Sequence, residues 1–256
     1  MNPVKLEVIA VPGLPMVQAG DDLVLLLEQA LEDSGLALCD RDVVVFAQKV
    51  ISKSEGRSVE LATVTPTQRA RDVAARVRKD PRLVELVLRE SKRIVREAPD
   101  VLIVEHRLGL IMANAGIDQS NVADPAGAER ALLLPADPDA SAERLRRELT
   151  RRCGREVAVI INDSFGRPWR LGTVGVALGC AGLPALLDLR GTPDLFGRTL
   201  RVTVVAYADE IAATASLLMG QAREGQPVII VRGLAARGAS TPAGSILRPP
   251  REDLFQ

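Results

Sequence analysis

Short runs of β-branched and aliphatic residues, each ending in a polar segment, constrain the fold of this chain more than any other feature. Runs of about four to eight such residues predict buried strands, here at Val4–Val11, Asp42–Ala47, 101–105, 109–113, Val157–Ile161, Leu200–Ala206 and Pro227–Val231. Helical periodicity occurs at 21–32, at 66–97 with a restart at Pro81, at 141–152 with Ser141 as N-cap, and at 209–219. The small apolar residues of 173–188 predict a buried helix. Because the strands are irregularly spaced, we expect an α+β fold with mixed sheets and packed helices.

Composition narrows the class of protein. Hydrophobic residues make up 47% of the chain and aromatic residues only 2%, so the core must be aliphatic, and a base-stacking surface is not expected. Thirty-three basic and thirty-three acidic residues give no net charge to attract nucleic acid or an anionic membrane. No apolar run reaches the length of a membrane span, about 20 residues, which favours the cytoplasm.

The single histidine, His106, argues against a zinc hydrolase or a Ser-His-Asp enzyme, and we expect it at the surface. Three scattered cysteines, Cys39, Cys153 and Cys180, are interpreted as thiols in or near the core. The length of 256 residues predicts one main domain over 1–234, with a division into two subdomains left open. Residues 235–256, rich in Arg, Pro, Gly and Ser, are expected to form an arm or tail.

Four polar segments follow apolar strands, where α/β proteins place their sites. The first is the turn Pro12-Gly13-Leu14-Pro15, which could approach a phosphate or simply end a strand. The second is the polar stretch Gln48–Arg57, whose Lys49 and Lys53 could contact phosphates or lie on a solvated loop.

The third segment is the loop from Asn114 to Ala126, in which Asp118 offers a carboxylate to a magnesium or manganese ion and Asn121 an amide to a nucleotide; an Asx-rich turn is the alternative. The fourth begins at Asn162, where a strand of hydrophobic residues delivers Asp163 and Ser164 at its tip. Carboxylate and hydroxyl oxygens both suit magnesium, and a carboxylate at a buried strand end needs a partner.

These segments, in this order, resemble those of the coenzyme F420-0:L-glutamate (gamma-glutamyl) ligase family. The similarity covers residues 7 to about 234 and is carried by GLPMVQAGDDL, VISKSEGR, NAGIDQSNV, LLLPADPDASAERLR, VIINDSFGRPWRLGTVGVALGCAG, DLFGR, ADEIAATASLLMG and VIIVRGL. The resemblance implies an unusual gamma-glutamyl-ligase fold in an intertwined homodimer. It also implies GTP-driven ligation of L-glutamate onto the F420 precursor F420-0, in coenzyme F420 biosynthesis.

The resemblance further implies a set of site residues and cofactors. GTP is the co-substrate, Mg2+ or Mn2+ the metal, and K+ a further candidate ion. Metal ligands would be Asp118, Asp163, Ser164 and Gln221, where Gln221 replaces a glutamate that relatives can carry and leaves the number of metals open. Nucleotide contacts would come from Pro12, Gly13, Leu14, Pro15, Gln48, Lys49, Lys53, Asn121 and a covering loop of Met219, Gly220, Gln221, Ala222, Arg223, Glu224, Gly225 and Gln226.

The chemistry predicted from both lines of reasoning is phosphoryl transfer from GTP to a carboxylate, followed by attack of the glutamate amine on the acyl phosphate. Lys49 and Lys53 would add positive charge at the phosphates. Arg167 and Arg170 are our own candidates for binding an acidic substrate and are not implied by the resemblance. Two other functions remain open: a nucleotide-dependent ligase for another carboxylate, and a GTP-binding dimer without turnover.

Overall fold

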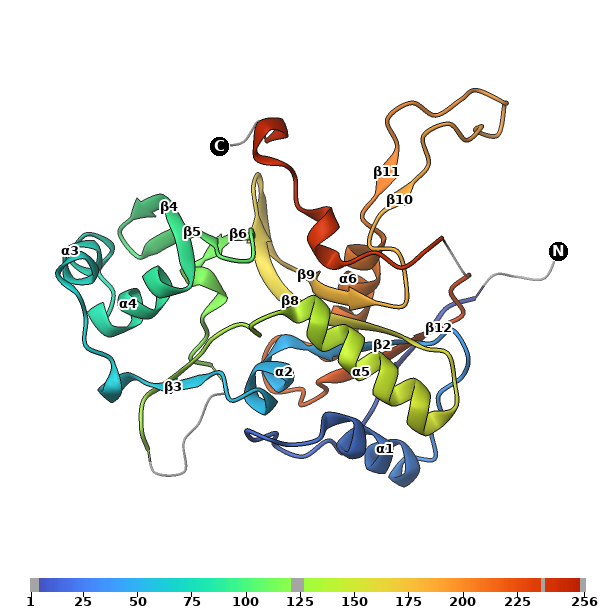
Figure 1. Cartoon of the computed structure of the whole chain (residues 1–256), viewed down its shortest axis with the longest axis horizontal. Coiled ribbons are helices and arrows are strands. Elements are labelled where there is room, and N and C mark those ends of the chain that lie inside the picture. Colours follow the sequence, from blue (N-terminus) through green and yellow to red (C-terminus); the bar gives the residue numbers. More distant parts are fainter. Residues whose placement is uncertain (1–4, 121–126, 236–237, 254–256) are drawn as a thin grey trace.

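The computed structural model describes residues 5–120, 127–235 and 238–253 (Figure 1). Its helices are α1 (Leu23–Asp33), α2 (Gln48–Ser54), α3 (Gln68–Val77), α4 (Pro81–Arg89), α5 (Pro138–Cys153) and α6 (Tyr207–Met219). Its strands are β1 (Glu7–Ala10), β2 (Val43–Ala47), β3 (Ser58–Glu60), β4 (Ser91–Ala98), β5 (Val101–His106), β6 (Ile111–Ala113), β7 (Arg130–Leu132), β8 (Ala158–Arg167), β9 (Arg170–Ala181), β10 (Leu187–Asp188), β11 (Val204–Val205) and β12 (Val228–Arg232). This arrangement confirms the α+β class.

A five-stranded sheet in the order β1-β12-β2-β8-β9 forms the centre of the molecule. β2 and β8 pair in parallel, and the other neighbours are antiparallel. Strands β1, β2 and β8 therefore run in the same direction, and their carboxyl ends meet at one edge of the sheet. The start of β12 lies at the same edge, because β12 is antiparallel to both of its neighbours.

Aliphatic layers cover both faces of this sheet, as the alternation along each strand requires. One face packs against α1, α2 and α5 through residues such as Leu27, Ile51 and Leu149. The other packs against α6 through Ile211 and its neighbouring alanines. Each fully buried Leu or Ile contributes about 1.5–3 kcal/mol relative to an exposed one, so these layers supply most of the stability of the sheet.

A smaller unit with its own apolar cluster lies beside the central sheet (Figure 1). Here α3 and α4 pack against the three-stranded sheet β4-β5-β6. The strand pair β3-β7 lies at the junction with the rest of the chain, close to α2. Glu85 on α4 is buried and accepts hydrogen bonds from the backbone and hydroxyl of Thr67 at 2.9 and 2.7 Å, which fixes the start of α3.

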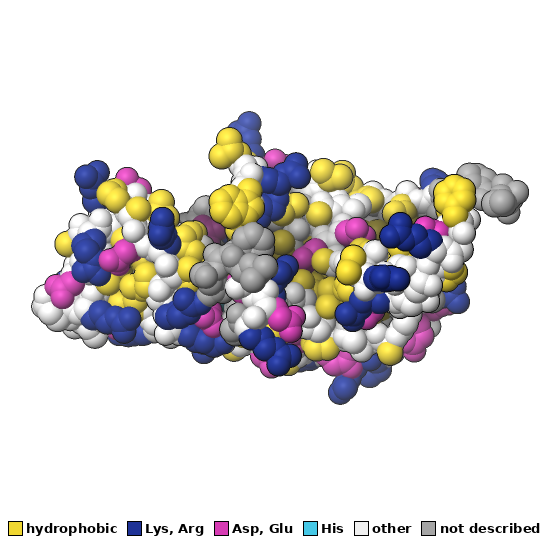
Figure 2. Space-filling model, turned by 90° about the horizontal axis from the view of Figure 1, so that it is seen from above, with side chains coloured by type: hydrophobic (Ala, Val, Ile, Leu, Met, Phe, Trp, Pro, Cys, Tyr) yellow, Lys and Arg dark blue, Asp and Glu magenta, His cyan; other side chains and the backbone are white. Residues whose placement is uncertain are grey.

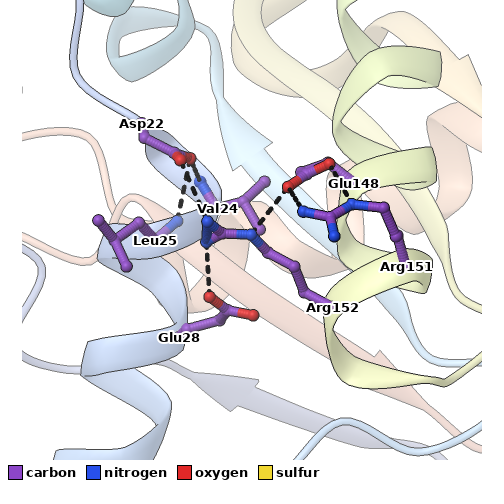
Figure 3. Close-up of polar contacts among 7 residues, drawn as sticks. All are labelled: Asp22, Val24, Leu25, Glu28, Glu148, Arg151 and Arg152. Carbon is purple, nitrogen blue, oxygen red and sulfur yellow. Dashed lines mark hydrogen bonds and ion pairs between the residues drawn. The ribbon is translucent and has the colours of Figure 1, made fainter.

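Helices α1 and α5 are joined by a network of ion pairs (Figure 3). Arg152 reaches Glu28 at 2.7 Å and Glu148 at 2.8 Å, and its guanidinium also lies 3.5 Å from Asp22. The carboxylate of Asp22 caps α1 by accepting from the backbone of Val24. One arginine therefore connects the start of α1 to the last turn of α5.

The chain after residue 235 docks on the central unit through a short 3-10 helix, Ala243–Ile246. The carboxylate of Asp139, near the start of α5, accepts from Ala243 N at 2.7 Å, Gly244 N at 3.2 Å and Cys180 N at 2.9 Å. One side chain thus holds the C-terminal segment against the outer edge of β9. The prediction of a domain boundary at 234 stays a prediction.

Two projections leave the body of the molecule (Figure 1). The ribbon that contains β10 and β11 carries Leu195 and Phe196 almost fully exposed, at 99% and 96%. The β8–β9 hairpin carries Trp169 and Leu171, which are also exposed. On the face shown in Figure 2, Lys and Arg side chains are scattered among acidic and hydrophobic ones.

Several predictions of secondary structure were wrong. Residues 173–188 form most of β9 instead of a helix, because Gly175 and Gly179 let other elements approach the strand. A Cβ on Gly175 would lie 2.1 Å from Ser216 Oγ of α6, and one on Gly179 would meet Pro138 of α5. The apolar small residues therefore serve close packing on a strand.

The region 66–97 is helical only to Arg89, and its last part is strand β4, which pairs with β5. The polar stretch after β2 is the helix α2 rather than a loop. The predicted strand 200–206 is reduced to the two residues of β11. Asp137, not Ser141, is the N-cap of α5; Ser141 is buried and donates to Glu55.

His106 and Cys39 also lie elsewhere than expected. His106 is completely buried beside Glu90, whose carboxylate pairs with Arg57 at 2.9 Å and Arg107 at 3.1 Å. Cys39 is exposed, whereas Cys180 is buried and Cys153 half-buried. Among the described residues, no helix has the length and apolar character needed to cross a membrane.

Candidate active site

The carboxyl edge of the central sheet gathers the polar segments that the sequence singles out. Val11 N donates to Val228 O at 3.0 Å, which places the turn after β1 beside the start of β12. Ala47 N donates to Pro227 O at 2.8 Å, so the end of β2 lies next to the same point. Ala47 is also the parallel partner of Asn162, the residue before Asp163. Segments from four parts of the chain therefore share one edge.

Helix α2 begins directly at this edge and carries Gln48, Lys49 and Lys53. Gln48 points into the protein, where its amide donates to Ser52 Oγ at 2.6 Å and it is almost fully buried. Lys49 and Lys53 are one helical turn apart and half-buried. Burial, together with the neighbouring charge of Lys49, lowers the pKa of the Lys53 ammonium.

Lys49 is held by the loop that follows β6. Its ammonium lies 2.7 Å from the Asp118 carboxylate and 2.7 Å from Ser120 Oγ. The hydroxyl and backbone N–H of Ser120 in turn donate to Asp118 at 3.0 and 2.7 Å. Burial alone would raise the pKa of Asp118, but the hydrogen bonds from Lys49 and Ser120 hold it below its ordinary value.

Asp163 lies on β8 near this pair. Burial raises the pKa of Asp163 to about 6, and the negative charge of Asp118 adds to the effect, while the backbone N–H of Ser164 and the charge of Lys49 oppose it. Two carboxylates therefore lie close together in a partly desolvated place with Lys49 beside both. Such an arrangement favours an additional cation.

Ser164 points to the other face of the hairpin and donates to Gln221 Oε1 at 2.6 Å. Gln221 follows Gly220, the residue that ends α6 with a φ of +72°. Asn162, two residues before Ser164 on β8, is buried and donates its amide to Ser216 Oγ at 3.0 Å. Strand β8 thus fixes the end of α6 and the first residues of the loop after it.

The two segments implied as nucleotide contacts at the rim are exposed. Pro12, Gly13 and Pro15 are accessible, Leu14 is half-buried, and Gly13 has a φ of +82° that glycine adopts without strain. Residues 221–225 are exposed, and Glu224 accepts from Ala222 N at 2.8 Å. Asn121 lies outside the described residues.

Arg167 and Arg170 lie at the far end of the β8–β9 hairpin. Arg167 is four residues beyond Asp163, roughly 13 Å along an extended strand, and its guanidinium donates to Gly172 O at 3.1 Å. Within the part of the chain that the structure describes, neither arginine is hydrogen-bonded to Asp118 or Asp163. The geometry therefore does not bring them into the carboxylate cluster.

The oxygens of this edge fit a hard divalent ion. Asp118 and Asp163 supply carboxylates, a donor type that Mg2+ and Mn2+ take, whereas the neutral oxygens of Ser164 and Gln221 lie on the opposite face of β8 and bond each other. No group of three or more His, Cys, Asp or Glu side chains suited to a metal occurs among the described residues. An ion would rely on two charged ligands, neutral oxygens and groups of its substrates.

Sequence reasoning gave no role to Ser120 or Asn162. Ser120 joins Lys49 to Asp118. The one sequence signal for this contact is the position of Ser120 two residues after Asp118, a spacing typical of an Asx turn. Asn162 was read only as part of the strand tip. Its contact with Ser216 depends on the packing of α6, which no local pattern reveals.

Comparison with known proteins decides which family has this site. The family model described as F420-0:Gamma-glutamyl ligase matches residues 13–233. The chain belongs to this family. Proteins named coenzyme F420:L-glutamate ligase are similar to it over nearly their whole length. That of Methanothermobacter thermautotrophicus is 47% identical, covering 98% of this chain and 99% of the relative. That of Methanopyrus kandleri is 44% identical over 98% of both chains, and that of Natronomonas pharaonis 45% identical over 89% and 86%.

The match to the F420-0:gamma-glutamyl ligase family begins within the turn after β1 and ends just past β12. It therefore contains the ends of β2 and β8 and the start of β12 at this edge, but not β1, Val11 or Pro12. The family resemblance inferred from the ordered motifs is confirmed.

Proposed function

We propose that this protein is a coenzyme F420:L-glutamate ligase that uses GTP to join L-glutamate to F420-0. The observation that carries the proposal is the pairing of full-length similarity to ligases of that name with the cluster of Lys49, Asp118 and Asp163 at one sheet edge. A ligase of this kind must bind a nucleotide, an acceptor carboxylate and an amine at one place.

The nucleotide is proposed to lie along the edge between the turn Pro12–Pro15 and the loop Met219–Gln226. Both are exposed and lie beside the start of β12. Lys49 and Lys53, one turn apart on α2, would face the phosphates as two positive charges. Gln48 would reach the nucleotide only after giving up its contact with Ser52.

The reaction proceeds in two balanced steps. The acceptor carboxylate oxygen attacks the γ-phosphorus of GTP, forming an acyl phosphate and releasing GDP. The amine of glutamate then attacks the acyl carbon, phosphate leaves with the bonding electrons, and the nitrogen loses a proton to give the amide. The ammonium groups of Lys49 and Lys53 stabilise the charge that develops on the phosphoryl oxygens.

Asp118 and Asp163 would hold the Mg2+ or Mn2+ ion, and Ser164 and Gln221, on the opposite face of β8, would reach it only after giving up their mutual hydrogen bond. When bound, that ion supplies charge neutralisation at the phosphates. Ser120 keeps the Asp118 carboxylate in place through two hydrogen bonds. Arg167 and Arg170 could bind an acidic group only at the outer end of an extended substrate, because they lie at the far end of the β8–β9 hairpin. The additional role suggested for K+ rests on the resemblance alone.

A homodimer is proposed on the exposed apolar side chains of the projecting ribbon. Leu195 and Phe196 at its tip are nearly fully accessible, and an isolated two-stranded ribbon is marginally stable by itself. A second copy of the chain would cover them. We place the reaction in the cytoplasm, where GTP and glutamate are both supplied.

The experiment is ligation by the wild-type protein and by Asp163→Asn with F420-0, L-glutamate, GTP and Mn2+, followed by mass spectrometry. The wild type should add glutamyl units with one GDP released per unit. The variant should fall at least about 100-fold in rate, because charge stabilisation at the phosphates is lost. Lys5→Met, at an exposed surface position, is the control. Unchanged ligation by Asp163→Asn would refute the role of Asp163 in charge stabilisation at the phosphates. A wild type that binds or hydrolyses GTP without forming a glutamyl product would refute F420-0 as the acceptor.

A further inference from the structure

A pocket lies beside the strand segment that carries Asp163. It has a volume of about 320 Å³, within the range of small-molecule sites, which starts near 300 Å³. Five parts of the chain form its wall: the turn before β6, the start of α5, the β8–β9 hairpin, the start of α6 and the C-terminal segment. In Figure 1, β6, the β8–β9 hairpin and the 3-10 helix Ala243–Ile246 lie near one another.

Strand register places one wall of the pocket next to Asp163. Val176, in its wall, is the direct antiparallel partner of Asp163. Opposite residues on one face have Cβ atoms about 4.5–5.5 Å apart. Phe165, also in the wall, is two residues beyond Asp163 and lies on the same face of β8. A molecule with one end at Asp163 could therefore extend directly into the pocket.

The lining of the pocket is mainly apolar. Leu108, Leu110, Phe165, Leu178, Ile246 and Leu247 supply hydrocarbon surface. The wall also carries charged side chains, namely Asp137, Asp139, Asp209, Arg248 and Asp253. Asp139 accepts from three backbone donors, and Asp209 accepts from Ala177 N at 2.9 Å. The apolar part of the wall thus suits an apolar group of ring size.

We infer that this pocket binds the apolar, ring-sized body of the carboxylate acceptor, while the acceptor carboxylate lies at Asp163. The inference rests on the proposed ligase function and adds the subsite that selects the acceptor. The turn Pro12–Pro15 lies beside β12, and the loop after α6 contacts β8 on the face opposite Asp163; neither segment lines this pocket. The C-terminal segment, held by Asp139, becomes part of the acceptor site.

The test fills the pocket from two independent segments. Leu110→Trp enters from the turn before β6 and Leu247→Trp from the C-terminal segment, and Leu25→Trp on the exposed side of α1 is the matched control. The KM for F420-0 in ligation, the affinity for F420-0 alone by calorimetry, the KM for GTP and the sedimentation coefficient are measured for each. Circular dichroism checks folding, and Leu110→Ala, which enlarges the pocket, replaces a variant that does not fold.

Filling should raise the KM and the dissociation constant for F420-0 at least about tenfold, since small changes of fit in apolar pockets have effects of that size. The KM for GTP and the sedimentation coefficient should not change, and Leu25→Trp should behave as the wild type. An unchanged KM for F420-0 in the pocket variants of an active enzyme overturns the inference and leaves the proposed function intact. An equal rise in the KM for GTP, or an altered sedimentation coefficient that marks an interface between copies, also overturns it. A wild type that neither ligates nor binds F420-0 overturns both.

Discussion

The anchoring of the C-terminal segment by Asp139 gives a quantitative prediction for Asp139→Ala. The carboxylate accepts from three backbone donors, and the two shortest bonds, to Ala243 and Cys180, involve buried residues. Hydrogen bonds to a charged acceptor contribute about 1.5–3 kcal/mol each. Taking the lower value for these two bonds and neglecting the more exposed bond to Gly244, the variant should lose about 3 kcal/mol.

The loss should appear first as local opening of the C-terminal segment. A change of about 3 kcal/mol increases the open population about 100-fold. Thermolysin cleavage before Ile246, which is partly buried in the anchored segment, is measured by mass spectrometry at limiting protease. It should accelerate by that factor, because cleavage then follows the open population. Urea unfolding monitored by circular dichroism gives the total free energy of unfolding.

The neighbouring Asp137→Ala is the control for this experiment. Asp137 caps α5 by accepting from Ala140 N at 3.0 Å, and loss of an N-cap costs about 1 kcal/mol. It should destabilise the protein slightly without accelerating cleavage before Ile246. Equal cleavage rates in the two variants, or a loss below about 1 kcal/mol in Asp139→Ala, would refute the idea that Asp139 anchors the segment.

Three further predictions concern other contacts. Lys49→Met should bind Mn2+ alone more tightly, measured by electron paramagnetic resonance, because the ammonium pairs with a proposed ligand; unchanged affinity would contradict this. Arg152→Ala should lower the free energy of unfolding in urea, and a double-mutant cycle with Glu28→Ala should show coupling, which salt reduces. The hydrogen bond from the backbone of Thr67 holds the pKa of Glu85 below its usual value, against the effect of burial. The ionised carboxylate therefore stabilises the folded state above the pKa of the unfolded state, and this stabilisation is lost as the pH falls through the pKa of the folded state. Glu85→Gln should therefore be less stable at neutral pH and lose less stability on acidification below about pH 4.5, in unfolding measured across pH.

The sequence predicted the strands that carry the site because their signal is local. The buried run of β2 and the run before Asp163 both consist of aliphatic residues that end in polar ones. The position of Lys49 just after β2 followed from that pattern. Asp163 was expected at a strand tip and lies instead within β8, which continues to Arg167. That they share an edge with Asp118 depends on which strands pair, and pairing is a property of the whole chain.

The failures have physical causes as well. Strand β9 is rich in small residues that would also suit a buried helix. The reason for a small residue at Gly175 is its close contact with α6, which the sequence alone does not reveal. A register shift between Ile161 and Asn162 then changes which face of the hairpin each following residue occupies. Helix α2 has seven residues and starts after Ala47 without a side-chain cap, so it lacks the usual start signal. His106 is buried beside Glu90, and the carboxylate of Glu90 also pairs with Arg57 and Arg107. The local sequence around His106 does not predict this arrangement.

The position of β12 has a consequence for how the protein is made. β12 lies between β1 and β2 in the sheet, and Arg232 of β12 pairs with Glu7 of β1. On the ribosome, β2, β8 and β9 can pair as soon as they emerge, whereas β1 must wait until nearly the whole chain has been synthesised. Pairing over such a separation in sequence is slow to form. During translation the turn after β1 and the loop before β12 therefore stay apart, and the nucleotide edge can form only in the last stage of folding.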